Sequence, residues 1–400
     1  MTARPIVLAN GISMPSVGLG TYQMNLSNLE IALPAALDAG YRSFDTAASY
    51  KNEQFIGEIF ALELSKRGLT RRDIFITTKL RPADQGYEKA LAAICQSATF
   101  LGGYIDLYLI HWPGAAKVKP SDDLNRVRRI ETWRALQDVY LLHHKRIKID
   151  DSSHIHNHTP LNHSCTSVEQ PTISALSNTV NMISPQSDRS ESDVKLLERL
   201  QEVYVRAIGV SNFNVYHIES LVAAPHFQVY PHVNQCEIHP AYHPPDMRAY
   251  CEEHAIHLQA YSSLGCGKLL ESQFLEYFPQ IQNMASERIA SLLEMSTTWT
   301  GDDSVRLGVG VGAAEVEILK TCTVGIYLRW ALQHGYSIIP KSCNPQRIRD
   351  NYVMATDLTL NGLTAENKGF QLSMDDMNYL DGMVTHHVCE KLCWDGSPVS

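Results

Sequence analysis

Short apolar runs alternate along most of the chain with segments whose apolar residues recur at helical spacing. The apolar runs predict strands at 41–47, 74–80, 105–111, 205–211, 231–238, 257–263 and 336–341. The segments around them predict helices at 28–39, 52–66, 86–101, 129–140, 194–203, 246–254, 323–334, 345–351 and 374–383. The strands are apolar throughout, which is typical of parallel strands that helices cover on both faces.

The number of strand–helix units decides between fold classes. A further apolar run near 353–358 brings the count to about eight units. Eight such units favour an α/β fold of the (β/α)8 TIM-barrel type over a doubly wound sheet. Before the first unit, the Asn10-Gly11 pair between Ile6 and Ile12 predicts an N-terminal β-hairpin.

Three regions break the alternation, at about 141–200, 279–318 and 359–371. The first is rich in Ser, His, Asn and Thr and shows little periodicity until its last residues, which is typical of a disordered or loosely packed insertion. We therefore expect one barrel domain over 1–400, interrupted by irregular insertions. Two origins remain open: translated non-coding sequence, or genuine lineage-specific loops.

Composition narrows the function classes. The formal net charge of −9 argues against a general nucleic-acid binder, which needs a basic surface. No apolar stretch is long enough to span a bilayer, and the N-terminal apolar run is too short for a secretory signal, so a cytoplasmic protein is expected. The nine cysteines form no disulfide-like framework, which indicates reduced thiols.

Four polar residues follow or end the strand-like runs: Asp45, Tyr50, Lys79 and His111. In a parallel barrel such positions converge on one face, where catalysis takes place. Tyr50 is predicted to be the general acid for carbonyl reduction, because a phenol can protonate the carbonyl oxygen as hydride arrives. The nearby Lys79 ammonium should lower the pKa of Tyr50, with Asp45 holding Lys79 in place. His111 would orient the carbonyl oxygen.

Several motifs together resemble the aldo-keto reductase family. They are Gly40 to Ala47 with Tyr50, Asn52 and Glu53; Gly209 to Phe213; Val233 to Glu237; Ile339 to Ser342 with Pro345, Arg347, Ile348 and Asn351; and the tail residues Cys393 to Asp395. The run from Ala260 to Leu270, with His111 to Gly114, is most similar to the glyoxal/methylglyoxal reductase or didehydrogluconate reductase branch.

This resemblance implies a site for NADPH/NADP+ across the barrel mouth. The implied cofactor-binding residues are Thr21, Ser211, Asn212, Gln235, Tyr261, Ser262, Leu264, Lys341, Ser342, Arg347 and Asn351. Within this set, Ser211, Asn212 and Gln235 would hold the carboxamide, and Tyr261 would stack on the nicotinamide. Lys341, Ser342 and Arg347 would grip the 2′-phosphate, with Asn351 on the adenine. The loop after 257–263 would fold over the pyrophosphate.

The substrate would be a small aldehyde or ketone. Tyr22, His111 and Trp112 are the implied substrate-binding residues, with Tyr22 and Trp112 lining an apolar pocket. A monomer is expected. The alternative function is a catalytically weak or inactive NADPH-binding regulatory protein of the same fold.

Two other patterns are not expected to bind a cofactor or a metal ion. Gly308, Gly310 and Gly312 lack the third glycine and the preceding strand of a dinucleotide-binding fingerprint. The histidines from His154 to His163, with Cys165, lie in a polar insertion, so no metal site is expected.

Overall fold

The computed structural model describes residues 5–152, 200, 203–297, 313–356, 371–386, 391–393, 396 and 398–400. Its strands are β1 (Ile6–Val7), β2 (Ser13–Met14), β3 (Leu19–Gly20), β4 (Ser43–Asp45), β5 (Phe75–Leu80), β6 (Tyr104–Ile110), β7 (Tyr204–Ser211), β8 (Val233–Glu237), β9 (His257–Tyr261) and β10 (Ser337–Ile338). Its α-helices are α1 (Leu26–Ala39), α2 (Glu53–Glu63), α3 (Tyr87–Phe100), α4 (Leu124–Ser152), α7 (Val215–Val222), α8 (Pro245–Glu253), α9 (Ser272–Tyr277), α10 (Pro279–Thr297), α11 (Ala313–Gln333), α12 (Pro345–Thr356) and α13 (Met374–Gly382).

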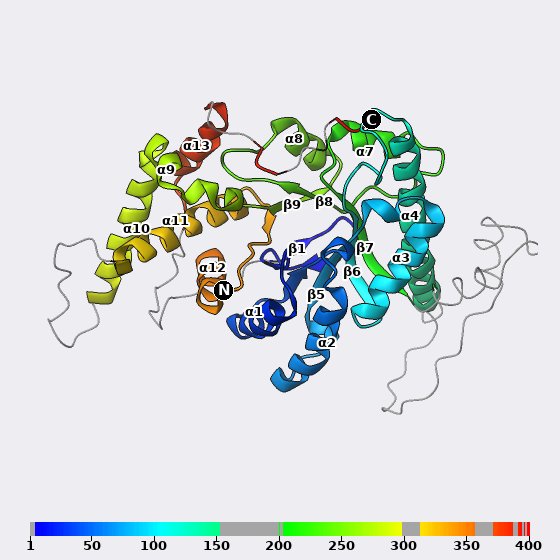
Figure 1. Ribbon diagram of the computed structural model, residues 1–400, viewed down its shortest axis with the longest axis horizontal. Coiled ribbons are helices and arrows are strands. Elements are labelled where there is room, and N and C mark those ends of the chain that lie inside the picture. The colour runs from blue at the N-terminus through cyan, green and yellow to red at the C-terminus, as the bar shows by residue number, and fades with distance from the viewer. Residues whose placement is uncertain are drawn as a thin grey trace, which may run out of the picture.

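Eight of the strands form one parallel sheet in the order β3 to β10 along the chain (Figure 1). Val17 pairs in parallel with Ile338, so the segment leading into β3 also meets β10 and joins the two ends of the sheet. The amide N–H of Gly18 donates to the carbonyl of Ile338 over 2.8 Å, and that of Ile338 donates to Ser16 over 2.8 Å. This architecture confirms the predicted (β/α)8 barrel.

The antiparallel hairpin of β1 and β2 is also confirmed, with Ile6 opposite Met14. Leu8 and Met14 of the hairpin are buried in a small apolar cluster with Phe75, Leu107 and Val233 from the barrel strands. The hairpin therefore closes one end of the barrel. Since βα loops lie at the opposite, C-terminal end of the strands, the chemistry is expected there.

The identity of the eighth strand was predicted wrongly. The run near 353–358 is not a strand, because residues up to Thr356 belong to α12, where Ile348, Tyr352 and Ala355 are buried at helical spacing. The eighth strand is β3, which has only two residues and therefore too little pattern to detect. Gly20 is needed in it, because a Cβ atom there would lie 2.8 Å from the carbonyl oxygen of Ile339.

Two of the three expected irregular regions are partly helical, which corrects the prediction. The region 141–200 begins with the last turns of α4, and 279–318 contains all of α10 and the start of α11. Ile281, Met284 and Ala285 are buried at i, i+3 and i+4, so α10 packs through an apolar stripe. The rest of these regions, and nearly all of 359–371, lie outside the described residues.

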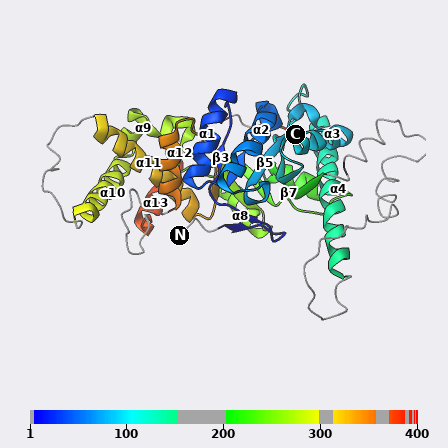
Figure 2. The ribbon, with the colours of Figure 1, turned by 90° about the horizontal axis from the view of Figure 1, so that it is seen from below.

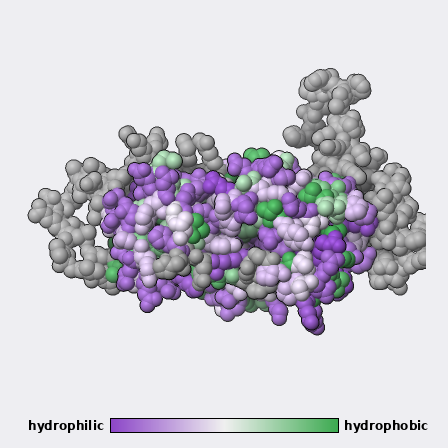
Figure 3. Space-filling model, turned by 90° about the horizontal axis from the view of Figure 1, so that it is seen from above, coloured by the Kyte–Doolittle hydropathy of each residue, from purple (hydrophilic) through white to green (hydrophobic). Residues whose placement is uncertain are grey.

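The helices surround the barrel unevenly. Helices α10, α11 and α13 lie beyond one side of the sheet and α3 and α4 beyond the other (Figures 1 and 2). On the face seen in Figure 3 the surface is mostly hydrophilic, with apolar residues scattered over it. Within the described residues, no helix combines the length and apolar character that crossing a membrane requires.

Candidate functional site

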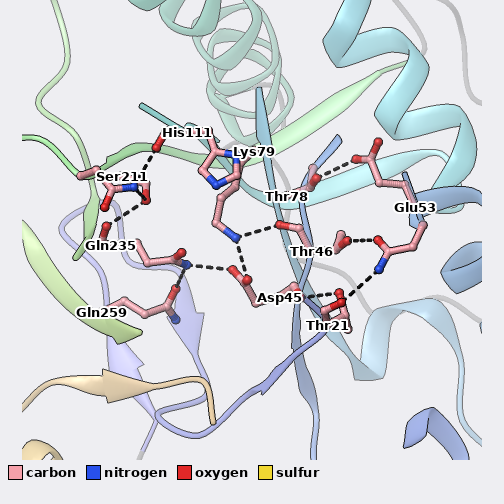
Figure 4. Close-up of polar contacts among 12 residues, drawn as sticks. Thr21, Asp45, Thr46, Glu53, Thr78, Lys79, His111, Ser211, Gln235 and Gln259 are labelled. Atoms are coloured by element: carbon pink, nitrogen blue, oxygen red, sulfur yellow. Dashed lines mark hydrogen bonds and ion pairs between the residues drawn. The ribbon is translucent and has the colours of Figure 1, made fainter. Parts of the chain in front are cut away.

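A buried ion pair lies at the centre of the candidate site. Asp45 is the last residue of β4, and Lys79 lies on the neighbouring strand β5. The Lys79 Nζ atom lies 2.6 Å from Asp45 Oδ1 and donates to the carbonyl oxygen of Thr46 over 2.8 Å (Figure 4). Lys79 is 1% exposed and Asp45 3%, so both charges are removed from water. Burial lowers the pKa of Lys79, and the Asp45 carboxylate opposes that effect.

Tyr50 and His111 lie over this pair. Tyr50 ends a short 3-10 turn, Ala48–Tyr50, that follows β4, and His111 follows β6. The Lys79 Nζ atom is 5.2 Å from the centre of the Tyr50 ring. The centres of the Tyr50 and His111 rings are 5.7 Å apart. The four residues that the sequence singled out therefore meet at the C-terminal ends of β4, β5 and β6.

The expected lowering of the Tyr50 pKa was wrong for the protein alone, because its net shift is upward. Burial first, and then the charge of Asp45 and the neighbouring Tyr22, hold the pKa of Tyr50 well above its usual value. The main physical reason is burial, which disfavours the charged phenolate, and the Asp45 carboxylate adds to that effect. Tyr50 consequently stays protonated, which is the form that can donate a proton.

His111 is held neutral. Burial, and to a smaller extent the charge of Lys79, lower its pKa to about 3. Its Nδ1 atom is buried, and no hydrogen-bond partner for it is found within the described part of the chain. A neutral imidazole has one N–H to donate, which suits the orientation of a carbonyl oxygen.

Gln235 on β8 supports the ion pair from the other side. Its Nε2 atom donates to Asp45 Oδ2 over 2.8 Å and to Gln259 Oε1 over 2.7 Å (Figure 4). The sequence predicted Gln235 as a cofactor residue, and both N–H groups of its amide are already engaged, which leaves the amide oxygen for a ligand. Gln259 was not predicted as a site residue, although a polar residue within the apolar run 257–263 could have indicated it.

A second set of hydrogen bonds ties His111 to the ends of β7, β8 and β9. Asn212 Nδ2 donates to the carbonyl oxygen of His111 over 3.0 Å and to Ser211 Oγ over 3.1 Å. Ser211 Oγ donates to the carbonyl oxygen of Gln235 over 2.9 Å. The Tyr261 hydroxyl donates to Asn212 Oδ1 over 2.7 Å. The structure thus brings four of the predicted cofactor residues together beside the ion pair.

Aromatic side chains flank the four central residues. The Tyr22 ring lies 5.0 Å from the Tyr50 ring and is 56% exposed. The Trp112 ring is stacked against His111, with ring centres 5.9 Å apart. Thr21, next to Tyr22, donates its hydroxyl to the carbonyl oxygen of Asp45 over 2.9 Å. An apolar wall therefore stands at the open side of the site, next to the predicted proton donor.

The residues predicted to bind the phosphate and adenine lie in the segment before α12, in its first turn and, for Asn351, further along the helix. Lys341 and Arg347 are exposed and have no ion-pair partner in the described part of the chain, whereas Ser342 and Asn351 are buried. The amide N–H of Arg347 donates to Asn344 Oδ1 over 3.1 Å, in the first turn of the helix. One cation in the first turn of a helix and another in the segment that leads into it, with a hydroxyl between them in sequence, fit a phosphate group.

The remaining predicted cofactor residues lie after β9. Ser262 has a left-handed backbone, with φ of 49°, and Leu264 precedes the 3-10 segment Gly265–Leu270. The Ser262 hydroxyl lies 3.4 Å from the sulfur atoms of both Cys266 and Cys393. These two residues border the site on the side of the C-terminal segment.

The glycine run at 308–312 and the histidines at 154–163 lie outside the described residues. Over the ranges that are described, no group of three His, Cys, Asp or Glu residues is arranged to hold a metal ion.

Comparison with known proteins places the chain among reductases. The model of the "Aldo/keto reductase family" matches residues 15–144 and 183–361. An "uncharacterized oxidoreductase YtbE" of Bacillus subtilis is 30% identical, with 94% of this chain and 91% of the relative aligned. The "glyoxal reductase" of the same organism is also 30% identical, over 94% of this chain and 92% of its own length.

Solved structures show the same fold. A mutant of Gox0644 in complex with NADPH superimposes with a TM-score of 0.60 at 25% identity, covering 100% of both chains. The Bombyx mori aldo-keto reductase (AKR2E4) in complex with NADP has a TM-score of 0.59 at 25% identity, covering 98% of this chain and 96% of its own.

Proposed function

The chain belongs to the aldo/keto reductase family, and on that premise we propose that it reduces aldehydes or ketones to alcohols with NADPH, using Tyr50 as the general acid. The observation that carries the proposal is the meeting of Asp45, Tyr50, Lys79 and His111 at one end of the barrel. They come from three successive strands and the connections that follow them, β4 for Asp45 and Tyr50, β5 for Lys79 and β6 for His111, so their convergence is a property of the fold.

The four residues divide the work of proton transfer. Bound NADPH supplies the hydride that the carbonyl carbon accepts. The Tyr50 phenol, kept protonated by burial, gives its proton to the carbonyl oxygen. The neutral His111 donates a hydrogen bond to the same oxygen and fixes its position. As Tyr50 loses its proton, negative charge develops close to Lys79, whose Nζ atom is 5.2 Å from the ring centre, and the ammonium stabilises it.

The cofactor would be held at two places. Ser211, Asn212 and Gln235 have their N–H and O–H groups engaged in the protein alone, so their side-chain oxygens would accept from the NH2 group of the carboxamide beside Asp45, and Tyr261 offers a ring for stacking. At the other end, Lys341, Ser342 and Arg347 would grip the 2′-phosphate, with Asn351 on the adenine. Thr21, Ser262 and Leu264 would complete the contacts. Because the two cations of the clamp have no ion-pair partner among the described residues, NADPH should bind more tightly than NADH.

The substrate is proposed to be a small reactive aldehyde. Tyr22 and Trp112 leave an aromatic wall beside Tyr50, which suits a short apolar or dicarbonyl chain. Among the relatives, one 30% identical is named "glyoxal reductase", and one of Trypanosoma cruzi, 28% identical, is named "9,11-endoperoxide prostaglandin H2 reductase". We propose that this activity resides in one barrel domain over 1–400.

Loss of NADPH absorbance with purified protein and a panel of aldehydes, methylglyoxal included, tests the proposal. Aldehyde-dependent oxidation is the expected result. Binding of NADPH without oxidation would favour the alternative, a regulatory NADPH-binding protein of the same fold. Failure to bind NADPH would contradict both.

A further inference from the structure

Two cysteines that are 127 residues apart in the sequence face one another beside the candidate site. The Cys266 and Cys393 sulfur atoms are 3.7 Å apart, and the Ser262 hydroxyl lies 3.4 Å from each of them. Cys266 lies in the loop after β9, and Cys393 in the C-terminal segment. We propose that these two thiols form a reversible disulfide that fastens the C-terminal segment to the loop after β9.

Hydrogen bonds hold the C-terminal segment beside the loop after β9. The carboxylate of Glu237, at the end of β8, accepts the amide N–H groups of Leu392 over 2.7 Å and of Cys393 over 2.9 Å. Further along, the carbonyl oxygen of Val399 lies 2.8 Å from His217 Nε2. The backbone of Cys393 is therefore anchored at the residue itself and further along the segment, and its sulfur faces the loop.

The loop is shaped to meet it. Gly265, Cys266 and Gly267 all have left-handed backbones, with φ of 57°, 54° and 93°. A Cβ atom on Gly265 would lie 2.6 Å from Leu269 Cγ and 2.9 Å from Leu392 Cδ1, and the left-handed backbone there also favours glycine. A disulfide needs a sulfur–sulfur distance of about 2.05 Å, so the two sulfur atoms, now 3.7 Å apart, must approach one another before the bond can form.

Exposure gives the two thiols different parts in the reaction. Among the cysteines in the described ranges, Cys266 is exposed while the others are buried or half-buried, so it meets an oxidant first. Burial raises the pKa of Cys393 to about 12, so Cys393 is a poor first nucleophile.

The oxidant we assign is a peroxide. The sulfur of Cys266 attacks hydrogen peroxide, breaks the O–O bond and becomes a sulfenic acid with release of one water. The sulfur of Cys393 then displaces the sulfenic oxygen, which leaves as a second water together with the Cys393 proton. Two thiols and one peroxide thus give one disulfide and two waters. A dithiol reverses the step by thiol–disulfide exchange.

The bond would restrain the site. Its formation does not depend on the proposed function, but its consequence does: Ser262 and Leu264, on the same loop, are proposed to contact NADPH. Because loops must open to release a bound ligand, tying this loop to the C-terminal segment should slow NADPH release.

Peptide mapping tests the bond. The purified full chain is treated with hydrogen peroxide, alkylated and digested with trypsin. The peptide 392–400 contains Cys393 alone, and 249–268 contains Cys251 and Cys266. We expect a disulfide that joins these two peptides, and fragment spectra should place it at Cys266. Dithiothreitol should separate the two peptides.

Single substitutions supply the controls. Cys266→Ser and Cys393→Ser should each abolish the link, whereas Cys343→Ser, a half-buried thiol elsewhere, should keep it. Linkage of Cys393 to the peptide carrying Cys389, or oxidation of Cys266 to a sulfinic acid without linkage, would overturn the proposal.

The consequence is measured separately. NADPH dissociation, followed by protein fluorescence in a stopped-flow instrument, should slow by about tenfold or more in the linked protein and recover with dithiothreitol. An unchanged rate in fully linked protein would overturn the restraint. If reduced protein does not bind NADPH at all, the proposed function and the restraint fail while the mapped bond still stands.

Discussion

Removing the Lys79 ammonium should destabilise the fold sharply, because Asp45 is then left as a buried charge. In Lys79→Met the carboxylate of Asp45, 3% exposed, loses its partner at 2.6 Å and keeps Gln235 as its remaining side-chain donor. Breaking a buried pair on one side costs about 3–5 kcal/mol. The variant should therefore lose roughly that much free energy of unfolding, measured by urea titration at pH 7.

The double variant Lys79→Met/Asp45→Asn separates charge from packing. It removes both charges and leaves an amide oxygen that can still accept from Gln235, so most of the lost stability should return. The exposed pair of Arg126 and Asp123 is the matched control, and Arg126→Met should cost about 1 kcal/mol or less. A loss below about 1 kcal/mol in Lys79→Met, or a double variant no more stable than the single one, would show that Lys79 does not neutralise a buried charge on Asp45.

Two further predictions concern the dependence of stability on pH and the contribution of the 2′-phosphate to NADPH binding. The folded-state pKa of His111 is about 3, below the 6.5 of the free side chain. Between pH 6.5 and pH 3 the unfolded state therefore binds more protons than the folded state, so the free energy of unfolding falls as the pH is lowered through this range. Between pH 8 and pH 5.5, His111 should lower the free energy of unfolding by about 1.4 kcal/mol. Urea titrations at the two pH values should therefore show a smaller fall in His111→Phe than in the wild-type protein. Equal falls in both proteins would contradict the assignment. Replacing Lys341 and Arg347 by alanine should weaken NADPH binding about tenfold or more while changing NADH binding little, measured as dissociation constants; equal weakening would exclude the phosphate clamp.

The barrel could be predicted because its strands carry strong local signals. The buried runs at β5, β6 and β7 are long and rich in β-branched and aromatic residues, so their positions agree with the structure to within about two residues. By contrast, β3 has two residues, one of them glycine, and owes its place to hydrogen bonds with β4 and the segment around β10. Such a strand is defined by its neighbours, so local sequence could not show it.

The candidate site was likewise predictable in part. Asp45, Lys79 and His111 could be placed because each ends or follows a predicted strand, and the fold then brings them together. The pKa of Tyr50 could not be predicted, because its direction depends on burial and on the charge of Asp45. The pairing of Cys266 with Cys393 likewise depends on where the C-terminal segment packs, a contact between residues 127 positions apart.

The most direct test of the central claim compares Tyr50→Phe with the wild-type protein, in both aldehyde-dependent NADPH oxidation and NADPH binding. The substitution removes the phenolic proton and keeps the ring that packs 5.0 Å from Tyr22. Turnover is expected to fall by about 10²–10⁴-fold, while the dissociation constant for NADPH is nearly unchanged. Turnover that is unaffected by the loss of the hydroxyl would mean that Tyr50 is not the general acid.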